Sequence, residues 1–544
     1  MQEAKVYKLI RDVKPKTSFG PDEISAEMLK LGGEILCIPL TYIINRSIIT
    51  EKFPSQWKIA TIKPLYKKKG AREDTANYRP VALLCVSGMI LERVITEQLE
   101  AHLEENGLMG PYQFGYRKKR STITAVATMS ANAEAERAKK KVVGMTMFDM
   151  SAAFDTVEKT TLCEKLWYLA ISKGGIRWIE SYMNGRKQKV KVGDKESCLE
   201  DITFGTPQGS RLSPLLFNIM MCDLNLYLRN GLLGNFADDT SNEVTGENAR
   251  IVKEKLEEDA TKMLQFTSSN NLCINPGKTA FICTSKEVES LEVGSKTIDR
   301  IDHTDLLGMK MSGDLTWSQH AEETKKKLKQ SIGILRRLKY NLPQSTMKIV
   351  AEAIFTSKLR GGIALYCKPR IKFCEPSNKL LRELTVIQND MMRAITMTKH
   401  GDRKSLKLLR EKTKTTSVNQ LICYHILTEA YNIISYNSSQ HMKELFMIKT
   451  GKRLGTRSEE KSLATIPINR GKNNGFLFYA TTLWNAIPQG LRDLAKSEES
   501  ADKAGARTLT DKEVRLRQAK IKKMQAGKFK RQIKLWISKN IPIQ

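Results

Sequence analysis

This sequence of 544 residues contains no Cys-x-x-Cys pair, only six histidines and no long apolar run. Its two nearest cysteines, Cys367 and Cys374, have no histidine at zinc-ligand spacing, which excludes the usual zinc knuckle. The longest apolar stretch, Ile35 to Ile44, is too short to span a bilayer, and charged residues interrupt every candidate signal sequence near the N-terminus. These absences predict an intracellular protein with reduced thiols and no membrane span.

The charge of the chain is strongly one-sided. Its 90 Lys plus Arg residues exceed its 59 Asp plus Glu residues, which leaves a net charge of +31. A surplus of this size favours a polyanionic partner, with nucleic acid ahead of an acidic membrane surface. The length allows roughly three or four domain-sized units.

Three regions of the chain differ in character. Up to about residue 140, turn signals separate apolar segments, and from about 141 to 300 strand-like runs alternate with helical ones. Beyond about residue 315 the pattern is helical and basic, with apolar residues at three- and four-residue spacing: Leu328, Ile332, Leu335, Leu338 and Leu342. The last segment, 501–544, is predicted to bind RNA or to be partly disordered, with one helix near Phe529, Ile533 and Trp536.

Carboxylates end two apolar runs. Asp149 closes the predicted strand from Val142, and Asp238 and Asp239 close a second run in a stretch short enough to form a hairpin. If the two strands pair, three carboxylates converge and repel one another unless a hard divalent cation neutralises them. The expected occupant is a pair of Mg²⁺ ions, with Mn²⁺ as a substitute. The alternative is that Asp238 and Asp239 form only a solvated turn or helix cap.

Short motifs resemble, in order, those of reverse transcriptases from retrotransposons that lack long terminal repeats (non-LTR, or LINE-type, elements), and jockey-like animal elements in particular. The similarity covers about residues 7 to 540. The motifs are Gly20–Ile24, Asn77–Val81, Gln113–Arg117 with Ser121-Thr122, Asp149–Val157, Gly205–Ser210 with Leu212–Pro214, Phe236–Asp239, Asn275–Thr279, Leu306–Gly308, Trp484–Pro488 and Phe529-Lys530.

The resemblance implies a right-hand polymerase of mixed α/β (α+β) class, with antiparallel sheet and packed helices in the fingers and palm and a helical thumb. We expect fingers with an N-terminal extension at 1–140, a catalytic palm at 141–300, a thumb at 301–400 and a basic, partly disordered C-terminal region at 401–544. The motifs depart from the family at Ala152, Thr206, Arg211 and Glu23, the last of which replaces a glycine.

The resemblance also implies roles for individual residues. Asp149, Asp238 and Asp239 would be catalytic and would bind metal together with the Met150 carbonyl. Residues expected to bind the nucleotide are Lys67, Arg79, Phe154, Gln208 and Gly209, and those expected to bind nucleic acid are Arg117, Lys278, Lys325, Lys329, Arg336 and Arg337. From spacing alone, Phe154 is equally a core residue, the glycine of the loop marks a turn, and any single lysine belongs to a solvated face.

The expected function is that of an RNA-directed DNA polymerase that extends a DNA 3′ end on an RNA template at a nicked genomic site. Its partners would be the RNA template, a DNA primer or target and deoxynucleoside triphosphates, with endonuclease activity supplied elsewhere. We expect a nuclear location with a cytoplasmic RNA–protein particle stage. The alternatives are a catalytically decayed, nucleic-acid-binding remnant and a host enzyme of the telomerase type.

Overall fold

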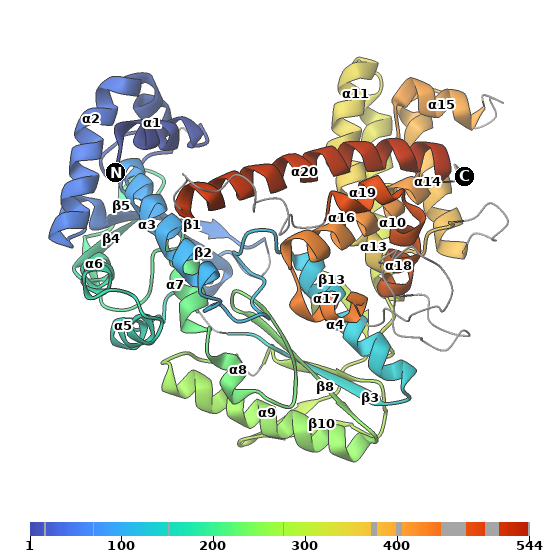
Figure 1. The fold of residues 1–544 in the computed structure, drawn as a ribbon, viewed down its shortest axis with the longest axis horizontal. Coiled ribbons are helices and arrows are strands. Elements are labelled where there is room, and N and C mark those ends of the chain that lie inside the picture. The colour runs from blue at the N-terminus through green and yellow to red at the C-terminus, as the bar shows by residue number, and fades with distance from the viewer. Residues whose placement is uncertain are drawn as a thin grey trace.

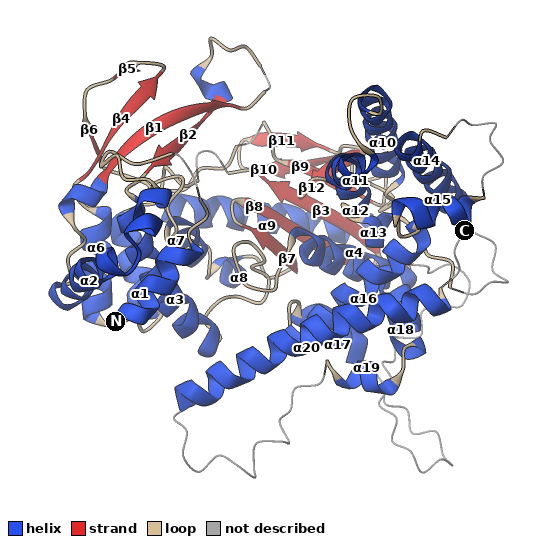
Figure 2. Ribbon diagram, turned by 90° about the horizontal axis from the view of Figure 1, so that it is seen from above, coloured by secondary structure: helices blue, strands red, loops and turns tan. Residues whose placement is uncertain are grey.

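The computed structural model describes residues 1–15, 18–68, 70–150, 153–275, 277–371, 378–398, 405–447, 475–495 and 511–541. In Figure 1 the N-terminal lobe lies at the left, the group of C-terminal helices lies at the right, and the central sheet lies below and between them. The long helix α20 (Asp511–Asn540) runs from the C-terminal helices toward the N-terminal lobe in both views (Figures 1 and 2).

The N-terminal lobe combines helices with a sheet drawn from two parts of the chain. Its hairpin, β1 (Ile59–Tyr66) and β2 (Tyr78–Leu83), is antiparallel, but β1 also pairs in parallel with β4 (Arg186–Val192). The remaining elements are α1 (Glu3–Asp12), α2 (Ala26–Thr50), 3₁₀ turns at Ser55–Lys58 and Thr75–Asn77, α3 (Val86–Glu105), α5 (Lys159–Tyr168), α6 (Lys173–Met183), β5 (Lys195–Glu196) and β6 (Glu200–Ile202). The predicted subdomain boundaries stay predictions, and strands from 186–202 join the sheet of 59–83.

The central sheet has the order β7-β8-β3-β9, and all its neighbours are antiparallel. Its strands are β3 (Val142–Phe148), β7 (Gly231–Phe236), β8 (Asp239–Gly246) and β9 (Ala280–Cys283). Adjacent residues of β8 reach opposite faces: Asn242 donates to Asp259 of α9 (Ala249–Ser269), and Glu243 accepts from Asn132 of α4 (Thr122–Ala138). The two helices therefore cover opposite faces, and α7 (Ser213–Met220) and α8 (Leu224–Tyr227) complete this part.

The sequence of β8 gives a weak strand signal. Four of its residues, Thr240, Ser241, Asn242 and Glu243, are polar, and Asn and Glu have low strand propensity. The strand nevertheless forms: β8 is eight residues long, pairs on both sides and buries all four of these side chains. The pairing with β3 and β7 outweighs local propensity, since a central strand satisfies its backbone groups from both neighbours.

Two hairpins and a helical region follow the central sheet. The hairpins are β10 (Ser290–Val293) with β11 (Lys296–Asp299) and β12 (His303–Leu306) with β13 (Met309–Ser312). The helices are α10 (Ser318–Leu338), α11 (Gln344–Ala351) with a π turn at Glu352–Thr356, α12 (Ser357–Arg360), α13 (Ile363–Tyr366), α14 (Lys379–Thr396), α15 (Leu406–Thr413), α16 (Val418–Tyr436), α17 (Gln440–Met447), α18 (Phe476–Ala486), α19 (Gln489–Asp493) and α20. No described helix is long and apolar enough to cross a bilayer.

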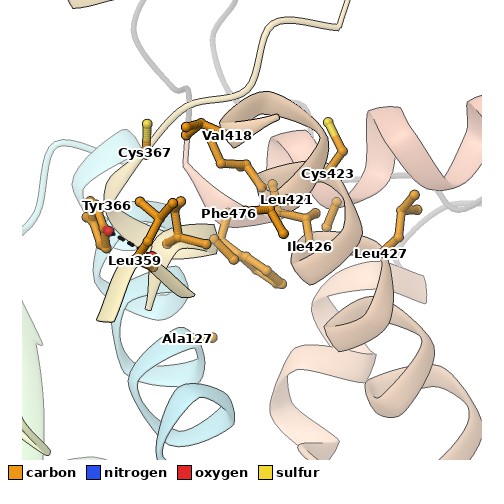
Figure 3. Close-up of a cluster of buried hydrophobic side chains, with 14 of the residues drawn as sticks. Ala127, Leu359, Tyr366, Cys367, Val418, Leu421, Cys423, Ile426, Leu427 and Phe476 are labelled. Atoms are coloured by element: carbon orange, nitrogen blue, oxygen red, sulfur yellow. Dashed lines mark hydrogen bonds between the residues drawn. The ribbon is translucent and has the colours of Figure 1, made fainter. Parts of the chain in front are cut away.

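The C-terminal helices share one hydrophobic core with α4 and the central sheet. The predicted apolar stripe is confirmed, since Leu328, Ile332 and Leu335 of α10 are buried in this core. Ala127 of α4 belongs to the same buried cluster as Leu359, Val418 and Phe476, and Figure 3 shows it below them. The C-terminal helices therefore pack directly against α4 and the central sheet.

The two tail motifs recognised in the sequence contact each other. Phe529 of α20 stacks on Tyr431 of α16 with ring centroids 4.3 Å apart, and its centroid lies 5.9 Å from that of Trp484 of α18. The helix predicted near Phe529 is confirmed, and it is longer than expected. The disorder predicted within 401–544 falls largely outside the described residues.

Candidate active site

Strand pairing brings the three carboxylates to one end of the central sheet. Asp149 follows the last residue of β3, and Phe148 of β3 lies opposite Thr240 of β8. Asp239 begins β8 opposite Phe236, so Ala237 and Asp238 form a two-residue turn in which Ala237 has a φ of 60°. The hairpin and the strand pairing expected from the sequence are both present, which places Asp238 and Asp239 beside Asp149.

The electrostatics of this corner are those of crowded carboxylates. Burial, together with repulsion from Asp238 and Asp149, raises the pKa of Asp239 to about 6, against the lowering effect of Lys278. Burial and Asp149 likewise raise the pKa of Asp238, against the opposing effects of Lys278 and Arg79. The Lys278 ammonium lies 3.1 Å from Oδ2 of Asp149. The cluster therefore attracts cations.

The donor chemistry fits a hard divalent cation. Asp149, Asp238 and Asp239 offer carboxylate oxygens, and Met150, which lines the same cavity, adds a backbone carbonyl. Among the described residues, no three His, Cys, Asp or Glu side chains are already gathered in the arrangement that holds an ion. Lys278 instead supplies the positive charge next to Asp149.

A cavity of about 820 Å³ opens in front of the carboxylates. Its wall contains the predicted nucleotide-binding residues and all three aspartates. The lining residues are Lys67, Tyr78, Arg79, Pro80, Tyr116, Asp149, Met150, Phe154, Asp155, Pro207, Gln208, Gly209, Ser210, Ser213, Pro214, Asp238, Asp239 and Lys278. Six separate sequence motifs thus meet in one cavity.

The side wall of the cavity is aromatic. The half-buried Phe154 ring has its centroid 5.0 Å from that of Phe217 on α7, and the ring of Tyr116 meets it edge-on at 6.5 Å. Two backbone bonds hold the Phe154 segment against the next motif: Thr206 N–H donates to the Phe154 carbonyl at 2.8 Å and Gly205 N–H to the Val157 carbonyl at 2.9 Å. The position of the ring is therefore determined by packing and by main-chain pairing.

The loop containing Gln208 and Gly209 lies against β2. The Ala82 N–H donates to the Gln208 carbonyl at 2.8 Å, and a Cβ built on Gly209 would lie 2.8 Å from the Ala82 carbonyl oxygen. Gly209 also has a φ of 128°, which side-chain-bearing residues rarely adopt. Only glycine fits this close approach without strain.

A buried hydrogen-bond network supports that loop from behind. The Tyr182 hydroxyl lies 2.8 Å from the Ser210 hydroxyl and donates to Oε1 of Glu92 at 3.1 Å. The other Glu92 oxygen accepts from the Arg211 N–H at 2.8 Å. Burial raises the pKa of Glu92. Since Arg211 lends only its backbone here, this contact is independent of the side chain that departs from the family pattern.

Two basic residues come from the β1–β2 hairpin. Arg79 lies opposite Leu65 in the register, and its charge lowers the pKa of Asp238, so it faces the carboxylates across the cavity. Lys67 lines the same cavity, and its ammonium donates to the Ala76 carbonyl at 2.8 Å. Both are placed where a triphosphate beside the carboxylates would need counter-charge.

The motif Gln113–Arg117 packs against the catalytic turn. Phe114 N–H donates to the Asn235 carbonyl at 2.7 Å, and a Cβ on Gly115 would lie 2.4 Å from the Ala237 nitrogen. Arg117 is engaged within the fold, since it makes two 2.7 Å bonds to the Glu104 carboxylate. Its predicted contact with nucleic acid stays a prediction.

The predicted basic residues of α10 differ in availability. Lys325 is mostly covered and pairs with Glu383 at 2.5 Å and Glu322 at 2.6 Å. Lys329, Arg336 and Arg337 are exposed on the same helix. A phosphate contact is therefore open to these three residues, whereas Lys325 would first have to give up its carboxylate partners.

Sequence reasoning assigned no role to Tyr116 or Asp155, which line the cavity. The Gln208 amide lies 3.3 Å from Oδ2 of Asp155, so this carboxylate positions the loop residue. Both residues lie within motifs found in the sequence, and this position was the signal that could have indicated a role for them. Spacing alone does not indicate which way a side chain points.

A second cavity, of about 710 Å³, adjoins the first and shares Asp149, Asp239 and Lys278 with it. Its far wall is the turn of the β12–β13 hairpin, Leu306–Gly308, where Leu307 and Gly308 have φ values of 50° and 82°. The motif recognised at Leu306–Gly308 therefore faces the carboxylates.

Comparison with known proteins agrees with this arrangement. Residues 66–295 match the family described as reverse transcriptase (RNA-dependent DNA polymerase). The probable RNA-directed DNA polymerase from transposon BS of Drosophila melanogaster is 28% identical over 408 residues, 72% of this chain and 44% of that protein. The RNA-directed DNA polymerase from mobile element jockey of Drosophila funebris is 26% identical over 327 residues, 58% of this chain and 35% of that protein. The chain thus spans less than half the length of these relatives.

Solved telomerase structures are also similar. Apo telomerase from Candida tropicalis has a TM-score of 0.39 and 13% identity, covering 71% of this chain and 62% of that chain. The family match and the mixed helix-and-sheet architecture with its antiparallel sheets agree with the right-hand polymerase class. Residues 66–295 therefore match a reverse transcriptase domain, and the chain is similar to the LINE-type RNA-directed DNA polymerases of non-LTR elements such as BS and jockey.

Proposed function

We propose that this chain is an RNA-directed DNA polymerase that adds deoxynucleotides to a DNA 3′ end on an RNA template. The observation that carries the proposal is the single cavity whose wall joins three carboxylates, two basic residues and an aromatic ring from separate motifs. Phosphoryl transfer needs positioning and charge stabilisation more than covalent chemistry, and this cavity supplies both.

The carboxylates form the metal-binding part of the site. Asp149, Asp238, Asp239 and the Met150 carbonyl would hold Mg²⁺, with Mn²⁺ as a substitute. Two such ions, when bound, activate the attacking 3′ hydroxyl and neutralise the leaving pyrophosphate. Lys278, already 3.1 Å from Asp149, holds that carboxylate in place.

The remaining walls select and orient the nucleotide. Arg79 and Lys67 bind the triphosphate oxygens. The Arg79 guanidinium binds them bidentately, and the Lys67 ammonium acts as a point charge. Gln208 and Gly209 lie against the new base pair, where glycine permits close backbone approach. Phe154 occupies the space that a 2′-hydroxyl would need, so deoxynucleotides are favoured.

The second cavity suits the primer end. It reaches the same carboxylates from the side of the Leu306–Gly308 turn, so a 3′ terminus lying there would meet a nucleotide in the first cavity. Lys278 lines both cavities and would contact the phosphate between them. The exposed Lys329, Arg336 and Arg337 would contact the backbone of the template–primer duplex.

In the cell, the nicked genomic target would supply the DNA 3′ end, and the endonuclease activity would come from elsewhere. Such target-primed synthesis requires a nuclear stage, preceded by a cytoplasmic particle that contains the RNA. The family's mobile-element relatives support this placement.

Primer extension tests the proposal. Purified chain, a DNA primer on an RNA template, Mg²⁺ and deoxynucleotides should yield extension that disappears in the double variant Asp238→Ala/Asp239→Ala. RNA binding by the double variant, measured by fluorescence anisotropy, should persist. Tight binding with no extension by either protein in Mg²⁺ or Mn²⁺ would instead support the decayed nucleic-acid-binding remnant.

A further inference from the structure

The described surface of α20 carries a concentration of unpaired positive charge. From Lys522 to Ile541 the sequence contains seven cations and no acidic residue: Lys522, Lys523, Lys528, Lys530, Arg531, Lys534 and Lys539. Within the described residues, none of the seven forms an ion pair, although 24 ion pairs involve other parts of the chain, such as Lys325 with Glu383. These charges are free to meet a polyanion.

Helical geometry divides the cations into two rows. Phe529, Ile533 and Ile537 form the buried stripe that attaches α20 to the C-terminal core. At about 100° per residue, Lys523, Lys530 and Lys534 fall together on one flank of this stripe, and Lys528, Arg531 and Lys539 fall on the side of the helix away from the stripe. We name these the inner row and the outer row.

The inner row faces a loop that leads to the catalytic cavity. Lys119 lies in that loop, three residues after Tyr116, whose ring lines the cavity. The Lys119 ammonium is 4.5 Å from the centroid of the Tyr436 ring, and the Tyr436 hydroxyl donates to the Lys522 carbonyl at 3.0 Å. Lys119 therefore lies next to α20 although about 400 residues separate them in sequence.

The electrostatics support this closeness. Burial lowers the pKa of Lys119, and Lys530 and Lys523 lower it further by repulsion. Three like charges held near one another are stabilised when an anion lies between them, and the backbone phosphates of nucleic acid have this chemistry. The inner row and Lys119 are thus one positive surface built from two distant parts of the chain.

Partly exposed tyrosine rings lie among these charges. Tyr436 lies under Lys119, and Tyr424 lies 5.3 Å from the Lys534 ammonium. Tyr116, at the cavity end of the loop, is 53% exposed. Alternating cations and accessible rings suit a single strand, because its unpaired bases can stack on aromatic faces while its phosphates meet lysines. A duplex presents its bases only at the ends.

We propose that Lys119 and the inner row of α20 bind the single-stranded 5′ part of the RNA template as it leads into the catalytic cavity. The proposal rests on the proposed polymerase function for the identity of the strand. Only the part of the template not yet copied is single-stranded, and the loop from Tyr116 to Lys119 joins the cavity to the inner row. The surface would act on RNA of any sequence, since phosphates and stacking carry little base information.

The test compares two triple variants of the full chain. One neutralises the surface, Lys119→Gln/Lys523→Gln/Lys530→Gln, and the other is the matched control, Lys528→Gln/Arg531→Gln/Lys539→Gln. Both remove three charges, and glutamine avoids placing a negative charge near Glu429, on which Lys530 acts. Fluorescence anisotropy measures binding to a primer–template that ends blunt and to one with a 5′ RNA overhang of about 20 nucleotides.

The 5′ overhang should tighten binding by wild type and by the outer-row control. In the inner-row variant, this gain in affinity should be smaller by on the order of tenfold. Its salt dependence on the overhang substrate should become shallower by about 2 in the log–log slope, as expected for three lost phosphate contacts on a single strand. All three proteins should bind the blunt duplex equally.

Equal losses in both triple variants, or a loss on the blunt duplex as large as on the overhang, would overturn the proposal. Extension is not measured on the blunt-ended substrate, because a blunt end leaves no template base to copy. If wild type fails to extend any primer, the polymerase function fails, whereas the comparison of overhang and blunt binding still decides whether this surface holds a single strand.

Discussion

Phe154 stands on the cavity wall with its ring between those of Phe217 and Tyr116. Replacing it with valine should open space for a 2′-hydroxyl, so incorporation of ribonucleotides relative to deoxynucleotides should rise by about 10- to 100-fold. Single-nucleotide incorporation with matched deoxy and ribo substrates measures the ratio. Phe204, an exposed aromatic residue outside this cavity, provides the control Phe204→Val. An unchanged ratio in Phe154→Val would remove Phe154 from sugar selection.

Gly209 tests the loop geometry. The change Gly209→Ala combines an unfavourable φ of 128° with a methyl group 2.8 Å from the Ala82 carbonyl oxygen, a strain of about 1–3 kcal/mol. The loop should shift away from β2, so the KM for deoxynucleotides should rise while the thermal midpoint changes little. Gly490→Ala is the control, because a Cβ added at Gly490 would meet no other atom within 4 Å. A KM equal to that of wild type would contradict this account of the loop.

At the residue scale, prediction succeeded where function is local in sequence. Asp149, Asp238 and Asp239 lie at or next to strand ends, and the strand pairing expected from the sequence brings them together, while their catalytic role stays a prediction. It was less informative for Arg117 and Lys325, because Glu104 and Glu383 come from elements that no sequence pattern links to them. A charged residue in a motif does not reveal whether the fold has already paired it.

Among the elements, α4 connects the catalytic sheet with the C-terminal helices through a polar stripe. Thr124, Thr128 and Asn132, four residues apart, bond respectively to Glu429, to the Ser439 hydroxyl at 2.9 Å and to His441 at 2.9 Å. Asn132 also donates to Glu243 of β8 at 2.8 Å. One asparagine therefore joins the sheet to α17.

Loss of that asparagine should weaken both contacts. Asn132→Ala leaves Glu243 and His441 without this buried partner, which should cost about 1–3 kcal/mol of the free energy of unfolding. Denaturant unfolding measures it, and hydrogen exchange should report increased opening of α17 in particular. A variant as stable as wild type, with α17 equally protected, would show that the stripe does not attach the C-terminal helices.

Glu243 makes stability depend on pH. Burial raises the pKa of this carboxyl well above its usual value, so the folded state keeps a proton that the unfolded chain releases. Stability should therefore fall as pH rises above the pKa of the same carboxyl in the unfolded chain. In Glu243→Gln the decline should be smaller, and in Glu247→Gln, an exposed site, it should match wild type. Identical slopes in all three proteins would contradict the assignment.

At the element scale, periodicity predicted the helices well and β8 poorly. The apolar residues of α10 recur at helical spacing, whereas two buried polar side chains of β8, Glu243 and Asn242, find hydrogen-bond partners in Asn132 and Asp259 of distant helices. Glu23 has a φ of 56°, a left-handed conformation that favours glycine, which is the residue that the family resemblance implies at this position. The departure strains the turn without altering the cavity.

The whole molecule depends on its C-terminal helices. Val126, Ala127 and Met129 of α4 share a core with Ile426, Leu427 and Phe476. A chain that ends after Thr398 would expose this apolar surface, so we expect it to aggregate and to lose primer extension. Size-exclusion chromatography with an extension assay checks this. A monodisperse, fully active truncation would mean that the C-terminal helices are dispensable for the catalytic sheet.

The fold class of the whole molecule was predictable from the sequence, because the motifs occur along the chain in the order that the family resemblance implies. The interleaving was not: β4 joins β1 across more than a hundred residues, and Lys119 meets Tyr436 across about three hundred. Such contacts depend on packing that no local pattern specifies. The inner-row surface is visible only once the chain is folded.

Template-directed incorporation of one nucleotide tests the central claim most directly. With a DNA primer, an RNA template and Mg²⁺, wild type should add only the deoxynucleotide complementary to the next template base. Asp149→Asn should add none while binding the same primer–template with equal affinity, because only the carboxylate site has changed. Incorporation by Asp149→Asn at the wild-type rate, or addition that ignores the template base, would contradict the account.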